Sequence, residues 1–419
     1  MKRPVRQYAA LLLVMTMSQP AATADVTDPV QIGPRPYWLV DQMKDSPLKE
    51  VLASCAAETH RFEHSDFSIA HRGAPLQFPE HTMESYLAAH RMGAGIQECD
   101  VTFTADGELV CRHAQCDLHT TTNILSLPLA EKCSEPFTPA SFDDAGKLIE
   151  PASARCCASD LTLSEFKSLA GKMDASDPTA TTVNEYLGGT ADTRTDLYAT
   201  GAMLLSHRES IDLIKTLGGK FTPELKAVTD GFGESGLDQH SYAAKVIEEY
   251  IDAGIDPQNV WPQSFFLEDV LFWVENYPSF GEQAVFLDSR NVAELAENPP
   301  SVSEFSELKH SGVNIIAPPM PVLLAVNHGG EIIPSDYAMN AKAADLDIIS
   351  WTTERSGRLI QDVVQGDSQF YYQTTLDALQ SDGDIFTTMD VLAQQVGIIG
   401  LFSDWPATTT FYANCVGLH

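Results

Sequence analysis

From about residue 66 onward, short β-rich runs alternate with amphipathic helical stretches. Strands are predicted at 67–70, 96–103, 220–225, 259–264, 284–288, 314–317, 347–351 and 398–403. Helices are predicted between them at 83–92, 210–217, 242–253, 268–275, 336–345 and 389–395. Seven or eight such units without a second repeat predict one α/β domain over 66–419, a (β/α)8 barrel of the TIM class. A doubly wound sheet is the alternative, but no glycine-rich dinucleotide loop follows any strand.

The alternation is interrupted after the second strand. A short run at 110–111 follows the Asp106-Gly107 pair, which favours a hairpin turn. Residues from about 115 to 200 are rich in Ser, Thr, Pro, Asp and Cys and contain one short helical stretch at 163–169. We interpret this segment as a cysteine-rich insertion at one face of the barrel. Residues 25–65 are expected to form an N-terminal extension that packs outside the barrel.

The first 24 residues are typical of an export signal. Three basic residues precede a short apolar run at 8–17, and Ala22-Thr23-Ala24 is a small-x-small cleavage site. The run is too short to span a bilayer, and no later stretch is long and apolar enough to do so. We therefore expect an exported protein, periplasmic or extracellular, that is cleaved near Ala24 and has no stable membrane insertion.

The cysteine content agrees with export. Disulfides are the expected state of cysteines in an exported chain. The eight cysteines are at positions 55, 99, 111, 116, 133, 156, 157 and 415. Five of them lie between 111 and 157, which indicates one stapled loop region that we expect to form a lid over the site. Zinc is the alternative, although no paired C-x2-C spacing supports it.

The chain is strongly acidic. Its formal net charge is −32. That charge argues against non-specific binding to nucleic acid or to anionic membranes. It allows a phosphodiester substrate only where a bound cation and a few Arg or Lys side chains offset the local charge.

Two strand ends carry groups suited to phosphate and metal chemistry. His71-Arg72-Gly73 follows the first strand, so its side chains can reach the mouth where barrel active sites lie. A guanidinium can bind a phosphate through a bidentate pair of hydrogen bonds. Glu98 and Asp100 are two positions apart on a strand and therefore share one face. Two such carboxylates are costly without a cation, and oxygen ligands suit Ca2+ or Mg2+.

Two further stretches add to this set. Arg112-His113 places a second imidazole near the same mouth, and two imidazoles can divide proton transfer to and from a phosphodiester. Glu224 and Lys226 share one face of the next strand. Glu224 could be a third carboxylate ligand, and Lys226 could offset charge on a phosphoryl oxygen.

Taken in order, these stretches resemble the glycerophosphodiester phosphodiesterase family. The resemblance covers about 66–406, apart from the insertion, and includes the later pieces Gln263-Ser264-Phe265, Trp351-Thr352 and Ser403-Asp404-Trp405-Pro406. It implies a (β/α)8 barrel that hydrolyses a small-molecule glycerophosphodiester to glycerol 3-phosphate and an alcohol. By motif matching, His71 and His113 would be the acid–base pair, and Arg72, Lys226, Glu80 and Trp351 would bind or surround the substrate. Glu98, Asp100 and Glu224 would hold one divalent cation, Ca2+ or Mg2+.

The chain departs from the family pattern at three positions. His81 and Glu354 stand where the family often has Asn, and Ala114 stands where it usually has an Asp that Asp117 could replace. Two alternatives remain. The same barrel could be a phospholipase acting on lysolipid or sphingolipid head groups, or it could bind phosphodiesters without turnover. The leaving alcohol, the choice of cation and the oligomeric state are not determined by the sequence.

Overall fold

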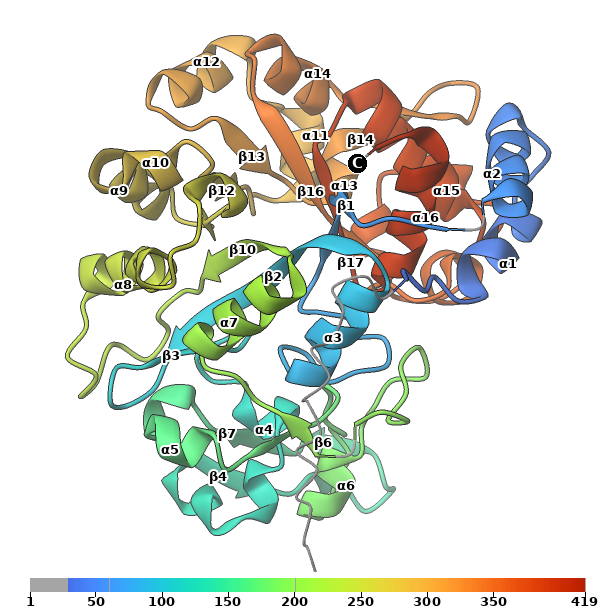
Figure 1. The fold of residues 1–419 in the computed structure, drawn as a ribbon. Helices are drawn as coiled ribbons and strands as arrows, with labels where there is room; N and C mark the ends of the chain where they lie inside the picture. The colour runs from blue at the N-terminus through green and yellow to red at the C-terminus, as the bar shows by residue number, and fades with distance from the viewer. Residues whose placement is uncertain (1–28, 60, 200, 419) are drawn as a thin grey trace, which may run out of the picture.

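The computed structural model describes residues 29–59, 61–199 and 201–418, so the predicted signal at 1–24 lies outside the described residues. Eight parallel strands form a closed barrel in which the last strand pairs with the first (Figure 1). In barrel order they are β1 (Ser65–Ala70), β2 (Ala94–Phe103), β10 (Lys220–Leu225), β11 (Gln263–Ser264), β12 (Val285–Leu287), β13 (Ile315–Ala317), β16 (Asp347–Thr353) and β17 (Gly400–Ser403). The predicted (β/α)8 fold is confirmed, and closure of the sheet rules out the doubly wound alternative.

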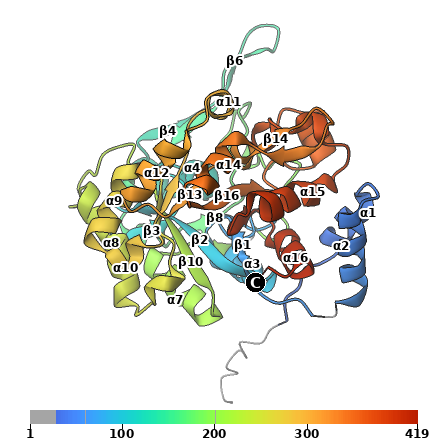
Figure 2. The same ribbon diagram turned by 90° about the horizontal axis from the view of Figure 1, so that it is seen from above.

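Helices cover the outside of the barrel (Figure 2). The main ones are α3 (Met83–Arg91), α7 (His207–Leu217), α8 (Gln239–Asp252), α9 (Leu267–Asn276), α12 (Val302–His310), α14 (Asp336–Ala343), α15 (Asp384–Asp390) and α16 (Pro406–Val416). Polar side chains define several starts, since Ser206 and Ser301 each form a capping box with a Glu three residues later. The predicted helix at 389–395 overlaps the end of α15 and a π-helical turn, Val391–Val396. The sequence did not predict α12 or α16.

The strands bury side chains on both faces. Inside the barrel, alternate residues such as Ile69, Ile96 and Phe402 form one apolar cluster. A larger cluster fills the layer between strands and helices. Because a strand points successive side chains to opposite faces, both clusters come from the same runs. This two-sided burial fits the wholly apolar sequences of β12 and β13.

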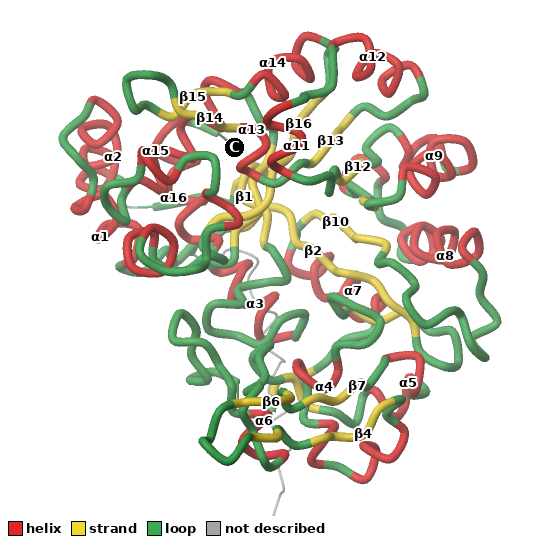
Figure 3. The backbone as a smooth tube through the Cα atoms, turned by 180° about the vertical axis from the view of Figure 1, so that it is seen from behind, coloured by secondary structure: helices red, strands yellow, loops and turns green. Residues whose placement is uncertain are grey.

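The insertion lies to one side of the barrel, beside α3 and α7 (Figures 1 and 3). It begins after β3 (Leu109–Cys111), which pairs antiparallel with β2. Its helices and strands are short: α4 (Leu118–Thr121), α5 (Leu163–Phe166), α6 (Val183–Leu187), β4 (Glu135–Thr138), β5 (Ser141–Phe142), β6 (Leu148–Glu150), β7 (Ser153–Arg155), β8 (Ala170–Gly171) and β9 (Ala202–Met203). They enclose a separate apolar cluster that includes Leu118, Phe166 and Tyr186.

All eight cysteines are paired in disulfides, which favours the disulfide prediction over zinc. Two bonds hold the insertion together, Cys116–Cys157 and Cys133–Cys156. A third, Cys99–Cys111, joins β2 to β3. The fourth, Cys55–Cys415, links residues 360 positions apart in the sequence. These bonds agree with export. Within the described part of the chain, no helix is long and apolar enough to cross a membrane.

The segment before β1 packs outside the barrel. Its helices α1 (Arg35–Gln42) and α2 (Pro47–Glu58) lie against α16 (Figure 2). The rings of Tyr37 and Phe62 both contact Phe411 of that helix. The Cys55–Cys415 disulfide therefore fastens an interface that apolar contacts already form.

We predict that replacing Cys55 and Cys415 together by Ala lowers the free energy of unfolding by about 2–4 kcal/mol, since the bond restricts a very long loop in the unfolded chain. Thermal unfolding without reductant measures the change. Because the bond lies away from the barrel mouth, cation binding at 25 °C should be retained. An unchanged melting temperature would show that the apolar contacts alone hold the extension.

Candidate active site at the barrel mouth

A cavity of about 280 Å3 opens at the carboxyl ends of the strands. Most of the predicted site residues line it: His71, Arg72, Glu98, His113, Glu224, Lys226 and Trp351. Asp100 and Glu80 are buried next to these residues rather than in the lining. The structure thus brings together the full predicted set from five strands, β1, β2, β3, β10 and β16, and the loops that follow them.

The three predicted metal ligands form one cluster. Strands β2 and β10 pair in register, with Asp100 opposite Glu224 and Glu98 two residues earlier. One oxygen from each of the three carboxylates lies within 4.8 Å of the other two. All three side chains are buried, and Oδ1 of Asp100 has no hydrogen-bond partner among the described residues. A divalent cation fits this set, because it prefers several oxygen ligands and would satisfy the unpartnered oxygen.

Electrostatics support the same interpretation. Burial, with repulsion from Asp100 and Glu224, raises the pKa of Glu98 well above its usual range. Burial also raises the pKa of Glu224 to about 7. Burial opposes ionisation of Asp100 as well, but Lys226 and His81 outweigh it and hold its pKa well below normal. The protein's own cations therefore do not suffice to keep all three carboxylates ionised.

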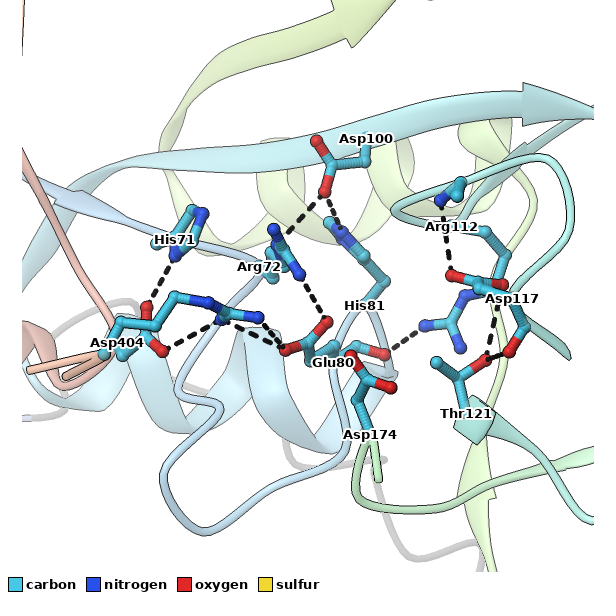
Figure 4. A network of polar contacts seen from close by, with 12 residues as sticks. His71, Arg72, Glu80, His81, Asp100, Arg112, Asp117, Thr121, Asp174 and Asp404 are labelled. Carbon is cyan, nitrogen blue, oxygen red and sulfur yellow. Dashed lines mark hydrogen bonds and ion pairs between the residues drawn. The ribbon is translucent and has the colours of Figure 1, made fainter. Parts of the chain in front are cut away.

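His71 is held by a carboxylate from the last strand. Its Nδ1 lies 2.5 Å from Oδ1 of Asp404 (Figure 4), and its Nε2 lies 3.9 Å from Oε2 of Glu98. An ionised carboxylate can only accept a hydrogen bond, so Asp404 favours the tautomer with hydrogen on Nδ1 and a lone pair on Nε2. Burial lowers the pKa of His71 to about 4, although Asp404 acts in the opposite direction. The ring is thus oriented as a proton acceptor.

The loop after β1 wraps around the carboxylates. Arg72 donates its backbone N–H to Glu98 at 3.0 Å, and its guanidinium lies 3.3 Å from Asp100. Gly73 follows with φ of +94°, and a Cβ atom there would come 2.2 Å from Oγ of Ser85. Only glycine fits this turn without displacing α3.

His81 accounts for the first departure from the family pattern. Its Nε2 lies 2.7 Å from Oδ2 of Asp100 (Figure 4). Its Nδ1 lies 2.9 Å from the hydroxyl of Tyr86. His81 is completely buried. The imidazole holds Asp100 in place through one nitrogen and is itself fixed through the other.

Glu80 forms ion pairs with three arginines. Its carboxylate accepts from Arg72 at 2.9 Å, from Arg355 at 3.2 Å and from Arg194 at 3.4 Å. Arg355 and Arg194 also pair with Asp404, at 3.0 and 3.6 Å. Burial opposes ionisation of Glu80, but the three arginines outweigh it and its pKa falls well below normal. Glu80 therefore positions cations around the cavity and does not line it.

Sequence reasoning missed Arg194, Arg355 and the part played by Asp404. Asp404 lay inside a quoted motif, Ser403-Asp404-Trp405-Pro406, so its position after the last strand was a usable signal. Arg355 follows Trp351 by four residues, but it belongs to no sequence motif that would have predicted a place in the site. Arg194 belongs to the insertion and is 114 residues from Glu80, so nothing local in the sequence pointed to that contact.

Two expectations about the insertion need correction. Asp117 does not supply a carboxylate to the cavity, because it accepts a hydrogen bond from the backbone N–H of Ala114 at 3.3 Å and from Thr121. It supports the loop that carries His113. The predicted lid is also not observed, since no described residue of 115–200 lines the cavity. The reason is that the insertion folds around its own apolar cluster beside the barrel.

Trp351 lines the cavity, whereas Glu354 does not. Trp351 donates from Nε1 to the carbonyl of Ala317 at 2.9 Å and presents its ring between Phe265 and Phe370. Glu354, the other departure from the family, turns away from the cavity. It is buried in an ion pair with Arg35 of the N-terminal extension and accepts a hydrogen bond from Thr408.

The cavity joins a carboxylate cluster, two imidazoles and three cationic side chains at the mouth of a barrel, an arrangement that fits a phosphoric diester hydrolase of the TIM-barrel class. The sequence model of the glycerophosphoryl diester phosphodiesterase family matches residues 71–206. An "Extracellular protein" of Arthroderma benhamiae is 45% identical over 249 residues, which are 59% of this chain and 100% of that protein. The glycerophosphodiester phosphodiesterase of Bacillus subtilis is 45% identical over 56 residues, 13% of this chain and 19% of that protein.

The fold comparison agrees. A crystal structure assigned to a glycerophosphoryl diester phosphodiesterase of Silicibacter pomeroyi superposes with a TM-score of 0.52 at 17% identity, covering 86% of this chain and 96% of that chain. The chain belongs to the glycerophosphoryl diester phosphodiesterase family.

We predict that Ca2+ or Mg2+ raises the melting temperature of the protein, since a cation that binds only the folded state at 100 times its Kd adds about 2.7 kcal/mol of stability. Glu98→Gln should abolish most of this increase, measured relative to the same variant without cation. The exposed Glu282→Gln serves as a control and should respond like the unmodified protein. Equal shifts in the two variants would place the cation elsewhere.

Proposed function

We propose that this protein hydrolyses glycerophosphodiesters to glycerol 3-phosphate and an alcohol with the help of one divalent cation. The observation that carries the proposal is the convergence of Glu98, Asp100 and Glu224 with two imidazoles in one cavity. Family membership supports the same reaction class. Export is supported by the four disulfides and by the Arthroderma relative.

Substrate would bind through its phosphoryl group. Arg72 and Lys226 both line the cavity and offer hydrogen bonds to phosphoryl oxygens. Glu98, Asp100 and Glu224 would hold the cation, Ca2+ or Mg2+, which when bound supplies positive charge that stabilises the developing negative charge at phosphorus. Burial of the three ligands strengthens these electrostatic effects.

The two imidazoles would move the protons. Nε2 of His71 would take a proton from the attacking oxygen, because Asp404 keeps hydrogen on Nδ1. His113 would give a proton to the oxygen of the leaving alcohol as the phosphorus–oxygen bond breaks. Burial, together with Arg72 and Lys226, lowers the pKa of His113 well below its usual value in the free protein. An anionic phosphoryl group between these residues would offset the two cations and favour protonated His113.

The attacking oxygen belongs either to water or to a hydroxyl of the substrate's own glycerol. In the second case a cyclic phosphate forms first, and water then opens it. Both routes use the same two imidazoles and consume one water overall.

The test of the function is an assay of the purified protein with glycerophosphocholine and with lysophosphatidylcholine, each with Ca2+, with Mg2+ and with chelator. We expect cation-dependent release of glycerol 3-phosphate from the small diester and loss of activity with chelator. Turnover of the lipid alone would favour the phospholipase alternative. Activity unchanged by chelator would contradict the role of the cation.

We predict that His71→Ala and His113→Ala each lower kcat by at least about 100-fold, because each removes one proton-transfer group. The exposed His328→Ala is the matched control and should retain full activity. The three variants are compared by initial rates at saturating substrate after their folding has been checked by circular dichroism. Near-normal turnover by either of the first two would remove that residue from the mechanism.

A further inference from the structure

A second cavity adjoins the active site. It has a volume of about 330 Å3 and shares two lining residues, Phe265 and Trp351, with the catalytic cavity. Its other lining residues come from the segments after β12, β13 and β16 and include Arg290, Asn291, Phe370 and Gln373. The two cavities therefore adjoin each other at Phe265 and Trp351, next to the cavity in which Arg72 and Lys226 would hold the phosphoryl group.

Aromatic rings form the wall between the two cavities. Phe265 meets Trp351 edge to face, with ring centroids 6.0 Å apart and planes at 89°. Phe370 lies on the other side of Trp351, at 6.4 Å and 26°. Tyr371 packs against both Trp351 and Phe370, at 6.0 and 4.9 Å. Phe370 is 50% exposed, so it presents ring surface that no protein group covers.

Most of the polar side chains around this cavity are already engaged. Arg290 forms a two-pronged ion pair with Asp288, at 2.9 and 2.5 Å. Oδ1 of Asn291 accepts from the backbone N–H groups of Ala293 and Glu294 at the start of α11 (Val292–Glu297). Nε2 of Gln373 donates to the carbonyl of Phe370 at 2.9 Å.

Because these polar side chains already have partners, they limit which kinds of substituent can bind in the second cavity. An anionic substituent would find the positive charge of Arg290 neutralised by Asp288, and a polyol would have to compete for Oδ1 of Asn291 and Nε2 of Gln373. The aromatic faces remain available, and such faces bind quaternary ammonium groups through cation–π attraction. The net charge of −32 also favours a cationic ligand over an anionic one.

We propose that this second cavity is the subsite for the leaving alcohol and that it selects an alcohol carrying a quaternary ammonium group. The inference rests on the proposed function and adds the identity of the leaving group. Phe370 is its specificity-determining residue, because it contributes aromatic surface to this cavity and does not line the catalytic one.

The test distinguishes the effect of the leaving group's positive charge from the effect of its apolar volume. Two substrates are compared, glycerophosphocholine and its neutral isostere with a 3,3-dimethylbutyl group in place of choline. The variants are Phe370→Leu, which keeps apolar bulk but loses the ring, and Phe370→Tyr, which keeps the ring. Phe266→Leu is the matched control, since Phe266 is 48% exposed and lines neither cavity.

We expect Phe370→Leu to lower kcat/KM for glycerophosphocholine on the order of 10-fold and to change the neutral isostere by less than about 2-fold. Phe370→Tyr and Phe266→Leu should behave like the unmodified protein on both substrates. An equal loss on both substrates, or no loss on glycerophosphocholine, would overturn the proposal.

Failure of the function itself is distinguishable. If the unmodified protein hydrolyses neither diester, the proposed function is wrong, and binding of tetramethylammonium chloride measured by calorimetry then tests the subsite alone. Binding that Phe370→Leu weakens about 10-fold, with Phe266→Leu unaffected, would support the subsite. No binding by the unmodified protein would overturn it.

Discussion

Three buried carboxylates at the ends of β2 and β10 cannot all be ionised without nearby positive charge, and the surrounding loops are arranged around that constraint. Lys226 bonds to Glu224, Arg72 lies against Asp100, and His81 is packed behind the same Asp100. These groups favour the ionised form of Asp100, yet the pKa values of Glu98 and Glu224 remain raised. A divalent cation would complete the balance, which links metal binding to the stability of this end of the barrel.

A second group of charged side chains, centred on Glu80 and Asp404, lies next to the three carboxylates. Glu80 and Asp404 both form ion pairs with Arg355 and Arg194. Glu80 also pairs with Arg72 (Figure 4). These contacts join the loop after β1, the insertion, the loop after β16 and the last strand. The insertion therefore reaches the site through the Arg194 side chain, although its main body lies to one side. Its contribution is to hold charges in place, whereas a lid would have covered the substrate.

The sequence was most informative where the pattern was local. The alternation of strands and helices predicted the barrel because both periodicities are visible within ten residues, and the strand-end motifs brought His71, Glu98 and Glu224 to one mouth because parallel strands place their carboxyl ends together. Contacts between distant segments left no such pattern. Arg194 and Phe370 belong to stretches without periodicity, and the effect of His81 depended on Asp100 and Tyr86 lying beside it. The position of the insertion depended on an apolar cluster whose members are scattered over its length.

The bond between His71 and Asp404 connects residues 333 positions apart, on the first and last strands of the barrel. Such distant pairings form late, because the entropy of closing a long loop must be overcome first. A nascent chain would thus carry both imidazoles and all three acidic ligands once residue 224 had been added, while His71 would stay unoriented until the final strand docked. Catalytic competence would then arrive as the closing event of folding, so that the chain would remain inert until its last strand had joined the barrel.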